Sequence, residues 1–145
     1  KYVSTIVSQL YKDNWRPDYI VGITRGGLTP SVMLSQFTGI KMHTLDVRLR
    51  DGDEKESNLW MADDAQAGKN ILVLDDINDT GATFNWIMED WDVSHDYPDE
   101  KTNVRFAVLM DNLASDCKVN MSYIGTEINK AEDPSWIVFP WEEWW

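Results

Sequence analysis

Residues 71–74 form an uninterrupted apolar run, Ile-Leu-Val-Leu. A strand that is apolar at every position is buried on both faces, and such strands are typical of the centre of a parallel sheet. Two adjacent acids, Asp75 and Asp76, follow the run directly, and a loop of small residues at 79–83 follows them. A buried strand, paired carboxylates and a glycine-containing turn, in that order, restrict the possible folds more than any other part of the sequence.

Helix-like and strand-like segments alternate along the rest of the chain. Apolar residues recur at helical spacing in residues 2–13 and 84–91, and a third helix is expected over residues 29–38, between Thr29-Pro30 and Gly39. Four more segments have the composition of strands, residues 18–23, 41–47, 104–110 and 121–128. We expect Thr29, which precedes a proline, to cap the second helix. The alternation predicts an α/β fold, a mainly parallel twisted sheet flanked by helices on both faces.

No internal repeat or low-complexity linker divides the 145 residues, so we expect a single domain over residues 1–145. Its core is expected over about residues 1–128, and the aromatic, irregular residues 129–145 are expected to form a small C-terminal hood. Two polar segments, residues 51–58 and 94–102, lack apolar periodicity and are interpreted as loops.

The charge balance restricts the partners. The chain has 13 Lys and Arg against 25 Asp and Glu, a formal net charge of −12. Nucleic acids and anionic membranes attract basic surfaces, so we expect neither as a partner. No apolar run approaches the length of a membrane span. The single cysteine, Cys117, cannot form an internal disulfide, which favours a reducing, cytoplasmic setting.

The acidic segment has the chemistry of a ligand site. The carboxylates of Asp75 and Asp76 can accept hydrogen bonds from sugar hydroxyls or hold a hard cation such as Mg²⁺. The loop at residues 79–83 offers backbone N–H groups, two hydroxyls and a helix N-terminus, which suit a phosphate. The alternative is that Asp79 caps the helix while the paired acids lie on a solvated turn.

The first predicted strand is followed by Thr24-Arg25-Gly26-Gly27. The glycines let the backbone approach a ligand closely, and Arg25 adds a planar donor fork suited to phosphate oxygens. A structural turn is the alternative. Because parallel strands end at one edge of the sheet, this loop and the acidic segment are expected to lie close together.

Residues 71–83, ILVLDDINDTGAT, resemble the phosphoribosyl diphosphate (PRPP) signature of the type I phosphoribosyltransferases. The resemblance implies that Asp75 and Asp76 bind the ribose hydroxyls near Mg²⁺, with the metal held mostly through PRPP. It implies that the 5′-phosphate lies in the loop formed by Asp79, Thr80, Gly81, Ala82 and Thr83. In the purine-using members the acid at Asp79 handles a proton at N7 of the base, which makes it the candidate catalytic residue.

The resemblance extends to two more segments. It implies that the pyrophosphate group is bound by Thr24, Arg25, Gly26 and Gly27. The family carries a flexible lid between its second and third strands, a place that Arg48, Arg50 and Lys55 occupy here. These basic residues complete the pyrophosphate site, or they belong to a solvated loop without a catalytic part.

Residues 135–141, SWIVFPW, resemble the C-terminal stretch of xanthine-guanine and hypoxanthine phosphoribosyltransferases. The resemblance implies that Trp136 stacks on the base and that Ile137 meets its edge through the backbone; a core position for Trp136 is the alternative. In the purine enzymes a lysine after the fourth strand donates to O6 of the base. Here Asp111 and Asn112 stand at that place; Asn112 offers an amide donor, and Lys118 lies six residues further on.

The resemblance implies an Mg²⁺-dependent transfer of ribose 5-phosphate from PRPP to a purine base, guanine, xanthine or hypoxanthine, with release of pyrophosphate. A PRPP-binding regulatory module without turnover and a transferase for another base, adenine or a pyrimidine, are the alternatives. The resemblance implies a homodimer or homotetramer. The Trp-rich residues 141–145 pack against a neighbouring subunit or close the hood over the base site.

Overall fold

A computed structural model describes residues 1–47, 59–93 and 103–142 of the chain. Its centre is a five-stranded sheet in which every pair of neighbouring strands is parallel, in the order β2-β1-β3-β4-β5. The strands are β1 (Tyr19–Thr24), β2 (Met42–Asp46), β3 (Ile71–Asn78), β4 (Val104–Asn112) and β5 (Tyr123–Ile128). The predicted fold class, a parallel sheet flanked by helices, is confirmed.

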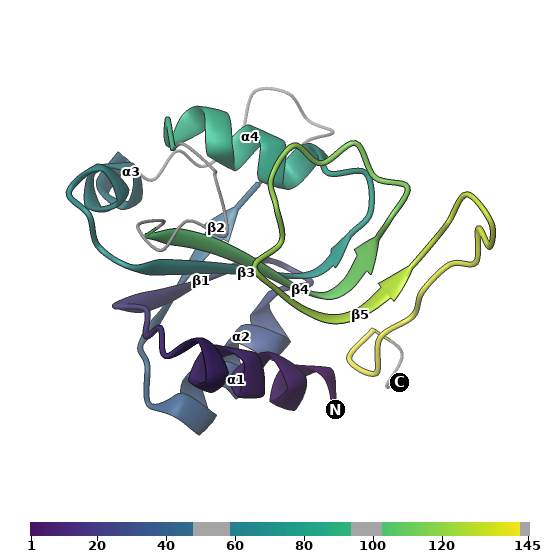
Figure 1. Ribbon diagram of the computed structural model, residues 1–145, viewed down its shortest axis with the longest axis horizontal. Helices are drawn as coiled ribbons and strands as arrows, with labels where there is room; N and C mark the ends of the chain where they lie inside the picture. Colours follow the sequence, from purple (N-terminus) through teal and green to yellow (C-terminus); the bar gives the residue numbers. More distant parts are fainter. Residues whose placement is uncertain (48–58, 94–102, 143–145) are drawn as a thin grey trace.

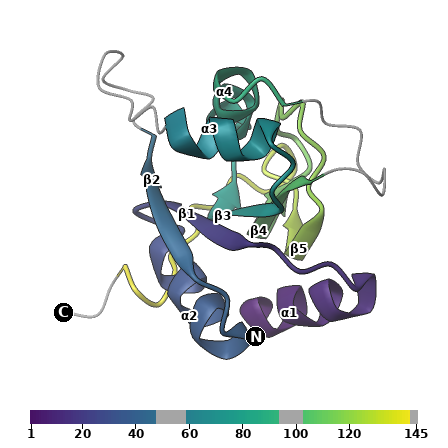
Figure 2. The ribbon, with the colours of Figure 1, turned by 90° about the vertical axis from the view of Figure 1, so that its left-hand side faces the viewer.

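The described residues include four helices, two on each face of the sheet. They are α1 (Tyr2–Asp13), α2 (Leu28–Thr38), α3 (Leu59–Gln66) and α4 (Ala82–Asp90). Helices α1 and α2 cover one face, and α3 and α4 cover the other (Figures 1 and 2). No helix among these residues combines the length and the apolar composition that crossing a bilayer requires.

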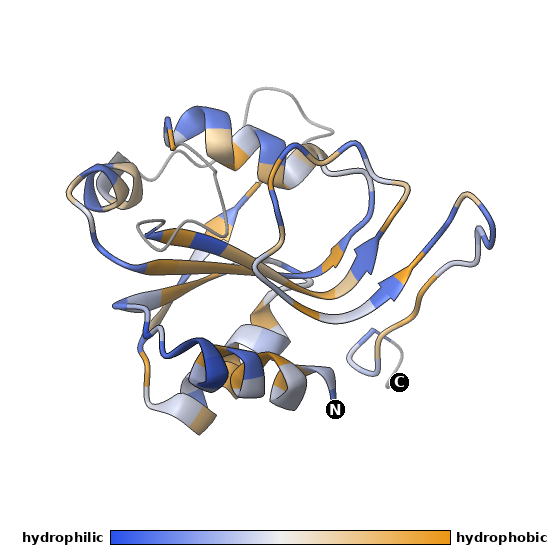
Figure 3. Ribbon diagram, viewed as in Figure 1, coloured by the Kyte–Doolittle hydropathy of each residue, from blue (hydrophilic) through white to orange (hydrophobic). Residues whose placement is uncertain are grey.

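The alternation of side chains along the strands builds two hydrophobic cores, one on each face. In β3, Ile71 and Val73 pack into the core beneath α3 and α4, while Leu72 and Leu74 pack into the core of α1 and α2. All four are essentially buried, as expected for a central parallel strand. The apolar residues accordingly lie along the inside of the layers (Figure 3).

Several element boundaries differ from the sequence-based expectation. Strand β3 continues to Asn78, so both acids that follow the apolar run belong to the strand. Helix α2 begins at Leu28 with Gly27 as its N-cap, and Thr29 therefore lies inside the helix instead of capping it. Helix α3 was not expected from the sequence, which has only a short apolar pattern there. The predicted loops at 51–58 and 94–102 lie outside the described residues.

The parallel arrangement brings the carboxyl ends of the strands to one edge of the molecule. The arrowheads of β3, β4 and β5 point the same way in Figure 1, and the tail at residues 129–142 leaves β5 at this edge. The tail then returns to the core of α1 and α2, where Phe139 is buried and Trp141 packs beside it. Loops that are distant in sequence therefore meet at this edge.

Candidate active site

The two acids of β3 are held in place by the local backbone. The backbone N–H of Asp76 donates to Oδ1 of Asp75 at 2.8 Å, and the N–H of Ile77 donates to Oδ1 of Asp76 at 2.8 Å. Both carboxylates line a cavity of about 220 Å³ at the carboxyl end of the strand. The paired acids thus face a shared cavity although the strand has not ended.

The ionised forms of Asp75 and Asp76 are disfavoured when no ligand is bound. Burial raises the pKa of the Asp75 carboxyl well above its usual value, and repulsion by Asp76 adds to the shift. Burial also raises the pKa of Asp76. A cation or a set of hydroxyl donors at this place would relieve the repulsion.

The loop after β3 forms the rest of this cavity, which residues 75–84 line. Gly81 has φ of +89° and is the N-cap of α4, without a side-chain cap hydrogen bond. A Cβ at Gly81 would lie 2.5 Å from the backbone of Cys117, so the left-handed turn and the close packing both require glycine. The alternative in which Asp79 caps this helix is therefore wrong.

The Arg-Gly-Gly loop lies directly against the acidic pair. A Cβ at Gly26 would overlap the carboxylate of Asp76, and one at Gly27 would lie 2.5 Å from the carbonyl oxygen of Leu74. The peptide bond between Thr24 and Arg25 is cis. The loop at residues 24–27 and the acidic segment are therefore in direct contact, which confirms the prediction that they lie close together.

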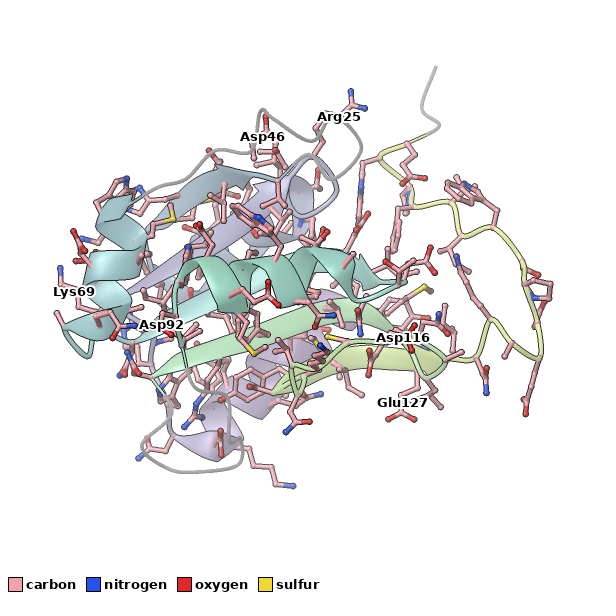
Figure 4. The ribbon with its side chains drawn as sticks, turned by 90° about the horizontal axis from the view of Figure 1, so that it is seen from above. Arg25, Asp46, Lys69, Asp92, Asp116 and Glu127 are labelled. Carbon is pink, nitrogen blue, oxygen red and sulfur yellow. The ribbon has the colours of Figure 1, made fainter. Side chains whose placement is uncertain are left out.

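Arg25 itself is exposed. Its side chain extends from the upper edge of the view in Figure 4, near Asp46, whereas Lys69 and Asp92 lie at the left end. The guanidinium is therefore free to meet an anion that approaches the carboxyl edge of the sheet. Arg48, Arg50 and Lys55, the candidate lid residues, lie outside the described part of the chain.

A second cavity, of about 180 Å³, adjoins the first. Its lining joins the end of β3 to the C-terminal tail and consists of Asp76, Ile77, Asp79, Lys130, Trp136, Ile137, Phe139 and Glu142. Asp76, Ile77 and Asp79 line both cavities. A ligand that spans the two cavities would therefore pass the carboxylates of Asp76 and Asp79.

Trp136 presents its ring to this second cavity. Its side chain is 78% exposed, so the alternative that places it in the core is wrong. The tail is anchored by its neighbours, because Ile137 packs against the core and Phe139 stacks on Trp141 with ring centroids 4.9 Å apart. Because the backbone that follows it is anchored, Trp136 offers its exposed ring as an aromatic platform on which a planar ligand can stack.

Asn112 has a different environment from the one expected of a residue that contacts the base. It is 6% exposed and lies within β4, which continues two residues beyond the predicted end. Its amide nitrogen donates to the carbonyl oxygen of Asp79 at 2.8 Å, and its amide oxygen accepts from the backbone N–H groups of Ala114 and Lys130. Asn112 therefore ties the loop of Asp79 to the turn after β5. Lys118 does not line either cavity.

Lys130 is the site residue that the sequence analysis missed. Its Nζ lies 3.1 Å from Oδ1 of Asp79 and 5.5 Å from the centre of the Trp136 ring. The sequence does place Lys130 two residues after a predicted strand, at the edge of the sheet where the other motifs lie, and this position could have indicated it. The lysine was expected after the fourth predicted strand, whereas Lys130 lies on the turn that follows the fifth.

Comparison with known proteins agrees with this geometry. Residues 1–145 match the model of the phosphoribosyl transferase domain family. A xanthine-guanine phosphoribosyltransferase of Cereibacter sphaeroides is 28% identical over 133 residues, covering 88% of this chain and 70% of that protein. One of Roseobacter denitrificans is 27% identical over 138 residues, covering 88% and 69%. The crystal structure of a purine phosphoribosyltransferase from Pyrococcus horikoshii superimposes with a TM-score of 0.66 at 25% identity, covering 99% of this chain and 87% of that one. This chain belongs to the phosphoribosyl transferase domain family.

Proposed function

We propose that this protein transfers ribose 5-phosphate from PRPP to a purine base and releases pyrophosphate. The observation that carries the proposal is the pair of adjoining cavities, one lined by a phosphate-type loop and one by an aromatic platform, with Asp76 and Asp79 lining both. Donor sugar phosphate and acceptor base would meet at this junction. The similar proteins are xanthine-guanine and purine phosphoribosyltransferases, which supports the proposal.

The loop between β3 and α4 is the proposed site of the 5′-phosphate. Residues 79–83 present backbone N–H groups at the N-terminus of α4, where the N–H of Ala82 lies 3.3 Å from Oγ1 of Thr80 and the N-cap, Gly81, has no side chain to cap the helix. The carboxylates of Asp75 and Asp76 accept hydrogen bonds from the ribose hydroxyls. The loop at residues 24–27, which packs against Asp76, binds the pyrophosphate group, and Arg25 contributes its charge.

Mg²⁺ is the proposed cofactor, and the residues at the site fit it. Among the described residues no group of three or more His, Cys, Asp or Glu side chains forms a metal cage. Mg²⁺ in phosphate-transferring sites is commonly held by one or two carboxylates together with substrate oxygens, and the buried, mutually repelling Asp75 and Asp76 suit that arrangement. When bound, the ion supplies neutralisation of the negative charge on the leaving pyrophosphate.

The residues of the chain position the reactants and move one proton. N9 of the base attacks C1 of the ribose, the bond from C1 to the pyrophosphate oxygen breaks, and pyrophosphate leaves with the electron pair. The base then carries one ring proton more than the product nucleotide does. Asp79 lines both cavities and accepts this proton from N7. Trp136 holds the base in the orientation for attack by stacking on its face.

A panel of bases tests the proposal. The protein is incubated with PRPP, Mg²⁺ and, in separate reactions, guanine, xanthine, hypoxanthine, adenine and uracil, and the nucleotide products are separated by chromatography. Formation of a purine nucleotide is the expected result. Tight binding of PRPP without a nucleotide from any base would instead indicate a regulatory module, and a product only from uracil would indicate a pyrimidine enzyme.

A homodimer or homotetramer remains a prediction. Exposed apolar side chains on α2, among them Met33 and Phe37, support self-association. Light scattering coupled to size-exclusion chromatography measures the mass in solution. The cytoplasmic setting remains a prediction from the single cysteine.

A further inference from the structure

We infer that Asn85, on α4, is a positioning residue for the 5′-phosphate of the donor. It holds the strap, a segment of the β4–β5 loop formed by residues 116–118, against the phosphate loop at residues 79–83. The strap in turn fixes the direction of one N–H group at the phosphate site. The inference rests on the proposed function and adds to it a residue that lies outside both cavities.

The side chain of Asn85 binds the strap backbone through both ends of its amide. Its Nδ2 donates to the carbonyl oxygen of Asp116 at 3.1 Å, and its Oδ1 accepts from the backbone N–H of Lys118 at 2.7 Å. One amide thus satisfies a carbonyl and an N–H two residues apart, as a neighbouring strand would. The strap is thereby tied to the first turn of α4, beside which the β4–β5 loop lies in Figure 1.

The strap contacts the phosphate loop through its backbone. The N–H of Asp116 donates to the carbonyl oxygen of Thr80 at 3.0 Å. The backbone of Cys117 lies so close to Gly81 that a Cβ on the glycine would be 2.5 Å from it. Both contacts are made at the peptide that joins Thr80 to Gly81, so the position of the strap determines the orientation of that peptide.

The orientation of this peptide determines where the N–H of Gly81 points. The peptide is trans, so its C=O and N–H groups point in nearly opposite directions. Because the carbonyl of Thr80 points at the strap, the N–H of Gly81 points away from it. Gly81 lines the first cavity, and in the part of the chain that the structure describes no group accepts a hydrogen bond from this N–H. A phosphate oxygen bound in the cavity would be its acceptor.

The strap has little buried surface of its own. Asp116 and Lys118 are exposed, and Cys117 is half-buried. A segment with so little buried surface opens locally at a low cost in free energy. The two hydrogen bonds of Asn85 are therefore expected to contribute much of what keeps the strap on the phosphate loop, and their loss should alter the loop without unfolding the core.

The contribution of the 5′-phosphate to binding tests this role. Inosine and inosine 5′-monophosphate differ only in that phosphate, and calorimetry measures the Kd of each without turnover. The ratio of the Kd of inosine to that of its monophosphate is compared between the native full chain and Asn85→Ala. We expect the ratio to fall roughly 5- to 10-fold in the variant, with the Kd of inosine unchanged. The KM for PRPP should rise by a similar factor while the KM for the purine stays the same.

Two substitutions at Asp116 test the strap while Asn85 is kept. Asp116→Pro removes the N–H that donates to Thr80, whereas Asp116→Ala keeps it, and both remove the same exposed carboxylate. The φ of Asp116 is negative, the sign that proline requires. We expect the ratio to be lower in Asp116→Pro than in Asp116→Ala. This pair provides the test if Asn85→Ala does not fold, as judged by its thermal transition.

Asn103 offers a matched control. Its Nδ2 also binds backbone, donating to the carbonyl oxygens of Ala65 at 2.9 Å and Lys69 at 2.8 Å. It directly precedes β4, at the amino end of the sheet, and it lines neither cavity. Figure 4 shows Lys69 at the left end of the molecule and Asp116 toward the right. Asn103→Ala should therefore lower the melting temperature and leave the ratio unchanged.

The outcomes separate this inference from the proposed function. Equal losses of affinity for inosine and its monophosphate, an unchanged ratio in Asn85→Ala and Asp116→Pro, or a native ratio near one would overturn the inference. If the native protein forms a purine nucleotide from PRPP while the variants leave the ratio unchanged, the inference alone fails. If the variants lower the ratio but the native protein forms no nucleotide from any base, the inference holds and the proposed function fails.

Discussion

Gly26 lies so close to Asp76 that a Cβ at the glycine would overlap the carboxylate. The contact joins the loop after β1 to the acidic end of β3, although the two are fifty residues apart in the sequence. The proposed pyrophosphate and ribose sites are thus built against each other, and a change at one of them is expected to displace the other.

Gly26→Ala tests this contact. The added methyl group must displace the Asp76 carboxylate, and overpacking of this kind costs about 1–3 kcal/mol of stability. Because small displacements of reacting groups have large kinetic effects, we expect kcat/KM for PRPP to fall roughly 100-fold. Steady-state kinetics and thermal unfolding measure the two effects.

Gly68→Ala is the control for that variant. Gly68 has φ of +88° and open space around it, so alanine there should cost about 1 kcal/mol through backbone strain and leave kcat/KM unchanged. Native-like PRPP kinetics in Gly26→Ala would show that the contact with Asp76 is not needed for binding.

Asp75→Asn is expected to stabilise the protein while it abolishes function. The pKa of Asp75 is raised in the folded state, so its ionisation opposes folding as the pH rises above about 4, the value of an unperturbed aspartate. Asparagine keeps an oxygen for the N–H of Asp76 and carries no charge. The melting temperature of the variant should exceed that of the native protein by a few degrees at pH 7.

The difference in melting temperature between Asp75→Asn and the native protein should disappear below pH 4. There the Asp75 carboxyl group is protonated in both the folded and the unfolded state. Thermal unfolding followed by circular dichroism between pH 3 and pH 8, at one ionic strength throughout, measures it. A variant less stable than the native protein at pH 7 would contradict the unfavourable charge assigned to Asp75.

The same pKa shifts predict a proton release on binding. If PRPP with Mg²⁺ favours the ionised pair, binding must expel protons that Asp75 and Asp76 hold, and affinity must fall as the pH is lowered. Calorimetry in two buffers of different ionisation enthalpy counts the protons, and chelation of Mg²⁺ should abolish the release. Proton uptake on binding would contradict the direction of these shifts.

The part of the fold that local patterns determine was predicted well. The run at 71–74 identified the central parallel strand, and the glycines of both loops indicated close backbone approaches. Sequence patterns do not show where a strand stops when its partner continues, and β3 and β4 pair as far as Asn78 and Asp111. This pairing keeps Asn112 inside the sheet and out of the cavity. The place of Lys130 depends on how the tail folds back, which only tertiary packing decides.

Trp136→Ala separates binding of the base from stability. The ring is largely exposed, so its removal should change the free energy of unfolding by no more than about 0.5 kcal/mol. Loss of stacking should raise the KM for the purine by roughly 10- to 100-fold, with the affinity for PRPP unchanged.

Trp60→Ala is the control, because Trp60 contributes to packing and lines neither cavity. The centre of its ring lies 5.7 Å from that of Tyr19 and 4.9 Å from that of His43. Trp60→Ala should lower the melting temperature and leave the KM for the purine unchanged. A Trp136→Ala variant with a native KM for the purine would show that Trp136 does not stack on the base.

The stoichiometry of the reaction with hypoxanthine is a direct test of phosphoribosyl transfer to a purine. The protein is mixed with PRPP, Mg²⁺ and hypoxanthine, and inosine 5′-monophosphate and pyrophosphate are quantified from the same samples over time. We expect the two products to accumulate in equal amounts, and Asp79→Asn to slow the formation of both while PRPP binding is retained. Pyrophosphate without the nucleotide, or neither product from a protein that binds PRPP, would contradict phosphoribosyl transfer to this base.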